Sequence, residues 1–320
     1  MRKISVLFLI FSMLFCVGCS GKDKDDGALD IVCTIFPQYD FARSIAGDAE
    51  NVNIKVLIGP GQESHDYDPS SKDIAAVHDC DIFICTGGES DSWVFDMLES
   101  VDTSDKIVLS LMDVVKEPLK EDIESVAETE EHLHDHGAID HVDYDEHVWT
   151  SPVNAMTIAD SVCEAMCEKM PEASELFREN YGILKSELEM LDKGFRDLTA
   201  NTAAPIIVVA DRFPLLYFCE EYGIRYYAAF SGCAASTEPS SKTVQFLIEK
   251  VREENIPAVF KMDMSTGNVA MTVAEATGAK VLTFYSCHTV STDDFNDGIT
   301  YVDLMNRNLQ SLKTLFVNEK

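Results

Sequence analysis

A long helical pattern near the middle of the chain constrains the fold more than any other feature. Between Glu172 and Asn201, apolar residues recur every three or four positions along an otherwise charged segment. This spacing predicts one amphipathic helix of roughly 28 residues, whose apolar stripe must pack against other elements. The stripe consists of Leu176, Phe177, Tyr181, Leu184, Leu188, Leu191, Phe195 and Leu198.

Strands and helices alternate on both sides of this segment. Short apolar runs predict strands at 31–35, 52–58, 81–88 and 106–111 before it, and near 205–211, 226–229, 258–262 and 280–285 after it. Helical patterns follow Pro37, Ser70 and Ser92 in the first half, and lie at about 213–222, 240–254, 267–277 and 297–316 in the second. Such alternation is typical of parallel sheets with helices on both faces.

We therefore expect an α/β fold of two lobes, each a mostly parallel sheet flanked by helices, joined by one long connecting helix. The first lobe includes an acidic, histidine-rich stretch at 116–146 without periodicity, which indicates a loop. Ligands in such sheets bind beyond the carboxyl ends of the strands, so the site is expected in the cleft between the lobes. The expected divisions are a signal peptide at 1–18, a lipidated N-terminus and linker at 19–29, an N-terminal lobe at 30–170, a linking helix at 171–201 and a C-terminal lobe at 202–320.

The N-terminus has the order of an export signal. Arg2 and Lys3 precede an apolar stretch at 4–17, which is too short to span a bilayer. Small residues before Cys19 resemble a bacterial lipoprotein cleavage site, although Cys16 stands where Leu is usual. We expect Cys19 to be lipidated and to hold the protein at the outer face of the cell membrane; ordinary cleavage and a periplasmic location are the alternative.

The charge of the chain excludes one class of partner. Its formal net charge is −31. Nucleic-acid affinity comes from Lys and Arg against phosphate, so we expect no nucleic-acid binding. An acidic field raises the local concentration of cations, although most of this acidity is expected to serve solubility.

Eight cysteines follow Cys19, and none forms a CxxC pair, which argues against a zinc ribbon or a thioredoxin site. Export permits disulfides. For most of these cysteines, however, we expect buried thiols that act as small apolar side chains. They are Cys33, Cys80, Cys85, Cys163, Cys167, Cys219, Cys233 and Cys287.

Five of the eight histidines lie within sixteen residues, in a run without Lys or Arg: His132, His134, His136, His141 and His147. Neutral imidazoles among carboxylates are good ligands for a zinc-type cation. His65 and His288 follow predicted strands and His147 ends the acidic loop, so these three are expected to face the cleft. His78 lies within a predicted helix and is expected to be an ordinary, partly buried histidine.

Three segments carry a family resemblance. GPGQESHDYDPSSKDI is similar to a G-x-x-x-H-x-Y-x-P segment, TGGESDSWV to a Gly-rich turn with a Trp, and DEHVWTSPVNA to a D-x-H-x-W-x-S-P segment. Over nearly the whole mature chain, the sequence resembles the metal-binding lipoproteins of zinc and manganese ABC importers, the cluster A-I substrate-binding proteins. The resemblance implies that His65 and His147 are metal ligands from the first lobe. It also implies that His132, His134, His136 and His141 form a metal-gathering loop like that of the zinc-type branch.

The second lobe departs from the family pattern. The resemblance implies a His or Glu ligand ten residues before Tyr222, where this chain has Arg212, which cannot bind a cation. Arg212 could turn away toward a carboxylate, Asp211 could supply an oxygen, or water could complete the site. The last family ligand aligns with His288.

Other second-lobe residues are assigned to the surroundings of the site. Arg212 and Glu238 are expected to lie near the metal ligands without binding the metal themselves. Cys287 could be a soft ligand, or it could form a disulfide with Cys233, since both follow strands of the second lobe. A free Cys287 thiol is the favoured state.

Three imidazoles and one oxygen suit tetrahedral Zn²⁺, whereas Mn²⁺ prefers sites richer in oxygen. Ni²⁺ and Co²⁺ also accept three histidines. The resemblance implies that a monomer captures the metal and delivers it to an ABC permease driven by an ATPase, without catalysis. Alternatives are a surface adhesin or metal buffer and, less favoured, a zinc hydrolase, although the chain lacks HExxH, GxSxG and P-loop sequences.

Overall fold

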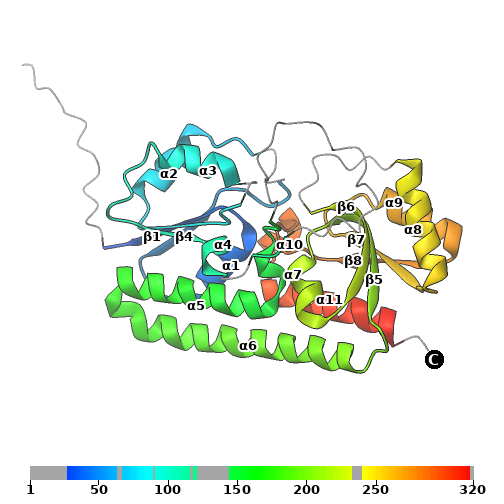
Figure 1. Ribbon diagram of the computed structural model, residues 1–320. Coiled ribbons are helices and arrows are strands. Elements are labelled where there is room, and N and C mark those ends of the chain that lie inside the picture. Colours follow the sequence, from blue (N-terminus) through cyan, green and yellow to red (C-terminus); the bar gives the residue numbers. More distant parts are fainter. Residues whose placement is uncertain are drawn as a thin grey trace, which may run out of the picture.

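The computed structural model describes residues 27–62, 67–88, 91–115, 118–120, 144–232 and 240–317. It confirms two α/β lobes linked by a long helix (Figure 1). In both four-stranded sheets every pair of neighbouring strands is parallel. The first sheet has the order β2-β1-β3-β4 and the second β6-β5-β7-β8.

The first lobe alternates strands with helices, as the sequence predicts. Its strands are β1 (Leu29–Cys33), β2 (Val52–Val56), β3 (Ile82–Cys85) and β4 (Ile107–Ser110). Its helices are α1 (Phe36–Ala46), α2 (Ser71–Asp79), α3 (Ser92–Leu98) and α4 (Leu111–Val114). One face of the sheet packs on α2 and α3 through a small apolar cluster that includes Val77, Phe83 and Val94.

The second lobe repeats this plan. Its strands are β5 (Ile206–Phe213), β6 (Arg225–Ser231), β7 (Ala258–Met262) and β8 (Lys280–Phe284). Its helices are α7 (Leu216–Tyr222), α8 (Ser241–Glu253), α9 (Asn268–Thr277), α10 (Thr292–Asn296) and α11 (Tyr301–Phe316). The prediction of a helix at about 297–316 is wrong at its start, because α11 begins only at Tyr301. Gly298, at φ +75°, makes the turn that separates α10 from α11.

The predicted linking helix is α6 (Ser174–Ala200), which follows α5 (Pro152–Lys169) after a 3-10 turn at Pro171–Ala173. Figure 1 shows both helices running along one side of the molecule, with α11 beside α6 under the second lobe. The buried stripe of α6 is Phe177, Leu184, Leu188, Leu191, Phe195 and Leu198.

The large core does not stop at the lobe boundary. One contiguous cluster of buried apolar residues includes Ile31 of β1, Leu188 of α6 and Val209 of β5. The lobes therefore share a core beneath the cleft, because α6 packs on α1, α5 and α11.

Within the described part of the chain, seven cysteines are free thiols, and all are buried as expected. They are Cys33, Cys80, Cys85, Cys163, Cys167, Cys219 and Cys287. Within the same residues, no helix is long and apolar enough to cross a membrane.

Candidate metal centre

A pocket of about 360 Å³ lies where the four strands of the second sheet end. Each strand contributes lining residues at or just past its carboxyl end, as expected for a parallel α/β sheet. The first lobe adds Gln62 and His147 from the opposite side. The second lobe contributes Asp211, Arg212 and Pro214 after the core of β5, Gly232 after β6, Met262–Thr266 after β7, and Ser286, His288 and Thr289 after β8.

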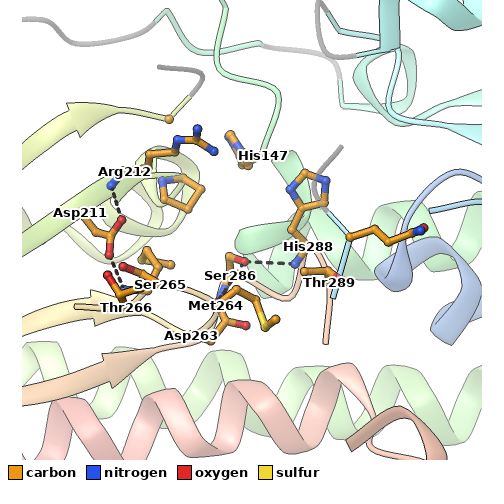
Figure 2. Close-up of a pocket in the computed structure, with 14 residues that line it drawn as sticks. His147, Asp211, Arg212, Asp263, Met264, Ser265, Thr266, Ser286, His288 and Thr289 are labelled. Carbon is orange, nitrogen blue, oxygen red and sulfur yellow. Dashed lines mark hydrogen bonds between the residues drawn. The ribbon is translucent and has the colours of Figure 1, made fainter. Parts of the chain in front are cut away.

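Strand β5 carries an irregularity directly before Arg212. Val209 pairs with Ala228 and Arg212 with Phe230, so one extra residue lies in β5 between these two pairs. A bulge of this kind turns the side chains that follow it. Figure 2 shows the Arg212 side chain extending into the pocket toward His147, so Arg212 does not turn away from the site.

His147 is held in one orientation by its neighbours. Its side chain is buried, and its Nδ1 lies 3.3 Å from Oδ1 of Asp145, which also accepts the His147 backbone N–H at 2.8 Å. A carboxylate beside one ring nitrogen is the usual device for leaving the other nitrogen as a metal ligand. The opposite lobe touches the same ring, because a Cβ on Gly232 would lie only 3.1 Å from His147 Cε1.

His288 is presented by a tight turn after β8. Its backbone N–H donates to Ser286 Oγ at 3.2 Å, and Cys287 between them has φ +60°. This left-handed conformation is uncommon for a residue with a side chain, and it gives the turn its sharp bend. The first lobe supports the turn, since the Phe36 N–H donates to the His288 carbonyl at 3.3 Å.

The two imidazoles meet across the interlobe boundary. Their ring centroids are 6.0 Å apart and their planes are inclined by 75°. Two imidazoles on one tetrahedral zinc ion have centroids about 5 Å apart, given zinc–nitrogen bonds of about 2.0–2.1 Å. A displacement of roughly 1 Å would therefore bring these rings to zinc-binding separation.

Two carboxylates that line the pocket, those of Asp211 and Asp263, already accept hydrogen bonds from backbone N–H groups. Asp211 accepts the Arg212 N–H at 3.0 Å and the Met262 N–H at 3.3 Å (Figure 2). Asp263 accepts from the backbone N–H and hydroxyl of Ser286 at 3.4 and 3.5 Å. Burial raises the pKa of Asp263 to about 6, although the Ser286 hydrogen bonds lower it.

The structure brings together only part of the expected ligand set. His147, His288, Asp211 and Arg212 all line the pocket. Among the described residues, no three His, Cys, Asp or Glu side chains lie close enough together to hold a metal ion. Other expected site residues lie outside the described residues: His65, His132, His134, His136, His141, Cys19, Cys233 and Glu238.

Cys287 is not arranged as a metal ligand. Its thiol is fully buried and faces the Tyr285 carbonyl at 3.8 Å. Burial raises the pKa of this thiol well above its usual range, and the thiolate is the form that binds metals. The geometry therefore favours His288 over Cys287 as a ligand. Cys287 is a free thiol, the state favoured over a disulfide with Cys233.

The expectation for His78 is wrong in one respect. Its side chain is 61% exposed and pairs with Asp79, so it is a surface residue. In the helix α2, only Val77 is buried.

Sequence reasoning missed three residues that shape the site. Asp145 had a signal, because it stands two residues before His147 in the quoted D-x-H segment. Trp149 belongs to the same segment, and its ring lies against both histidines. Gly232 had no signal, because its closeness to His147 arises only when the lobes meet.

Comparison with known proteins gives one family. The family model described as zinc-uptake complex component A, periplasmic (ZnuA), matches residues 31–315. The zinc-binding lipoprotein AdcA of Streptococcus pneumoniae strain TIGR4 is 30% identical over 315 residues, which are 98% of this chain and 61% of AdcA. This chain therefore spans about three fifths of that relative's length.

Two further relatives match over most of their own length. The high-affinity zinc uptake system protein ZnuA of Bacillus subtilis strain 168 is 27% identical over 319 residues, covering 98% of this chain and 97% of that protein. The crystal structure of the Zn(II)-bound ZnuA-like domain of Streptococcus pneumoniae AdcA superposes with a TM-score of 0.72 at 25% identity. That match covers 90% of this chain and 99% of the domain.

Proposed function

Because the chain belongs to the zinc-uptake complex component A family, we propose that it is an extracytoplasmic binding protein that delivers Zn²⁺ to an ABC importer. The observation that best supports this function is the meeting of His147 and His288, one from each lobe, in a single pocket. A cation held by both lobes favours their closed arrangement, which is a state that a membrane partner can recognise.

The proposed ligands are His65, His147 and His288, with water or the Asp211 carboxylate as the fourth. Three imidazoles and one oxygen suit tetrahedral zinc. The histidines at 132, 134, 136 and 141 gather metal in front of this site, and a lipid on Cys19 tethers the protein to the membrane. The relatives named above are described by zinc binding and zinc uptake, not by adhesion or catalysis, so we expect no turnover.

The delivery partners are a membrane permease and its ATPase. A monomer is expected to dock on the permease with its metal-loaded cleft. The acidic charge of −31 would raise the local concentration of cations around the protein before capture.

Titration calorimetry with Zn²⁺ tests the ligand assignment. The double variant His65→Ala/His147→Ala is expected to lose tight binding, whereas His78→Ala, which removes an exposed histidine, is expected to bind as the wild type does. Nanomolar affinity in the double variant would show that the site is elsewhere.

Deletion of residues 130–142 separates a transport protein from a metal buffer. A transport protein keeps one tightly bound metal ion after the deletion, as metal analysis of the purified protein would show. Loss of most of the bound metal would instead favour a buffer built on the histidine-rich loop.

A further inference from the structure

Trp149 occupies the point at which the two lobes and both pocket histidines meet. It belongs to a 3-10 turn (Val148–Thr150) that begins directly after His147. Its side chain is among the largest fully buried ones, with 1% of the residue exposed. A tryptophan is rarely buried so completely, which indicates a close fit on every side.

The indole ring contacts both imidazoles. Its centroid is 5.3 Å from that of His147 and 5.2 Å from that of His288, with interplanar angles of 59° and 60°. These are the tilted, edge-directed geometries that aromatic pairs prefer. Trp149 therefore contacts two imidazole rings that come from different lobes.

Hydrogen bonds hold both the side chain and the backbone of Trp149. Its Nε1–H donates to the Ser286 carbonyl at 2.9 Å, two residues before His288. Its own carbonyl accepts from the Tyr301 hydroxyl at 2.7 Å. Ser286 in turn accepts the His288 backbone N–H through its hydroxyl, so the indole is linked to the turn that presents His288.

Other contacts of the described residues each support one of the two histidines, at the His147 ring or at the His288 backbone. Asp145 and Gly232 constrain His147, whereas Ser286 and Phe36 constrain His288. On the basis of the zinc-binding function proposed above, we propose that Trp149 is a positioning residue that aligns His147 and His288 across the lobe boundary. It thereby fixes the coordination geometry offered to the metal, without binding the metal itself.

The variant Trp149→Phe tests this role, because it keeps an aromatic ring but removes the Nε1–H and part of the contact area. The matched control is Tyr222→Phe, which also keeps an aromatic ring and removes one hydrogen-bond donor, to Asp192, from a buried side chain that does not line the pocket. Zn²⁺ affinity is measured by competition with a chromophoric chelator. We expect a loss of about 10–100-fold for Trp149→Phe, the range seen when outer supports of metal ligands are removed, and little change for Tyr222→Phe.

The absorption spectrum of bound Co²⁺ separates positioning from general stability. Saturating Co²⁺ should give the intense visible bands of tetrahedral coordination in wild type and Tyr222→Phe, and weaker, shifted bands in Trp149→Phe. A Trp149→Phe protein with wild-type bands at saturation overturns the proposal, whatever its thermal stability. Absence of tight Zn²⁺ binding in the wild type would instead overturn the proposed function.

Discussion

Arg212 is the residue that most distinguishes this pocket from the pattern that the family resemblance implies. It stands where a His or Glu ligand is expected, and the bulge in β5 directs it into the pocket. A guanidinium remains charged at any physiological pH and offers no lone pair. Arg212 therefore cannot supply the ligand that the resemblance implies at this position.

Replacing Arg212 by His should strengthen zinc binding. The change adds a nitrogen ligand and removes a like charge, which at the edge of a half-buried site costs about 1–2 kcal/mol. We expect affinity for Zn²⁺ to rise about tenfold or more, as measured by chelator competition. Arg212→Gln, which removes the charge without adding an imidazole, should give a smaller gain. Weaker binding by Arg212→His would indicate that Arg212 supports the site.

At the residue scale, sequence patterns predicted that His147 and His288 face one pocket, but not what surrounds them. The positions of His147 and His288 could be predicted because each follows a strand or loop end in a recognisable segment. The bulge before Arg212 could not, because it depends on the pairing of β5 with β6. His78 was placed incorrectly, since its helix α2 turns only Val77 fully into the core.

Two glycines on α6 show how one element meets different surroundings. A Cβ at Gly182 would meet nothing within 4 Å, whereas a Cβ at Gly194 would lie 2.8 Å from Leu309 Cδ2 of α11. Gly194 thus permits the close approach of α6 and α11, and Gly182 has no comparable packing role.

The substitution Gly182→Ala should stabilise the protein by about 0.5–1 kcal/mol, because alanine favours the helical backbone. Gly194→Ala gains the same helix propensity but must displace the buried Leu309, so its net effect should be neutral or destabilising. Denaturant unfolding of the two variants gives the comparison. Equal stabilisation by both would show that the α6–α11 contact is looser than the structure indicates.

Helix α2 begins with a capping box that is sensitive to pH. Asp73 accepts from the hydroxyl and N–H of Ser70 at 2.6 and 3.1 Å and from Lys55 at 2.9 Å. Partial burial raises the pKa of Asp73, but these hydrogen bonds outweigh it and lower the pKa to about 2. Its stabilising effect is therefore complete above the ordinary pKa near 4 and is lost as the pH falls toward 2.

The variant Asp73→Asn should be less stable than the wild type at pH 7 by about 0.5–1 kcal/mol, a small value because the pair with Lys55 is near the surface. The difference should shrink as the pH falls from about 4 to about 2. Thermal unfolding of both proteins across this range provides the measurement. A difference that stays constant with pH would exclude the carboxylate as its source.

At the scale of the whole molecule, the lobes are joined below the cleft as well as by α6. Asp40 of α1 accepts the Tyr301 N–H at the start of α11 at 2.7 Å and pairs with Arg43 at 2.7 Å. Arg43 also donates to the carbonyls of Gly298 and Ile299. These contacts leave movement easier at the mouth of the cleft than at its base.

Asp40→Ala should lower the free energy of unfolding by about 2–4 kcal/mol, because it leaves the buried Tyr301 N–H and the Arg43 Nε–H without their acceptor. Burial raises the pKa of Asp40, although Arg43 and the Tyr301 N–H lower it. The ionised form is thus disfavoured in the folded protein, and this contribution lowers stability as the pH rises. Asp40→Asn, which keeps an acceptor, should therefore cost less than Asp40→Ala in denaturant unfolding.

The overall architecture followed from the sequence because it depends on local periodicity. The apolar stripe on α6 and the alternation of strands with helices can both be recognised within short segments of the chain. Contacts between distant residues, such as Trp149 with Ser286 or Asp40 with Tyr301, depend on how the lobes dock. No local pattern specifies that docking.

The buried thiols allow the opening of each lobe to be measured separately, through the rate at which a reagent labels them. A thiol reagent in solution reaches Cys80 and Cys85 only when the first lobe opens, and Cys219 only when the second does. Labelling rates, read peptide by peptide in a mass spectrometer, then report the opening free energy of each lobe. If bound Zn²⁺ holds the lobes together, adding Zn²⁺ should slow thiol labelling in both lobes by a similar factor.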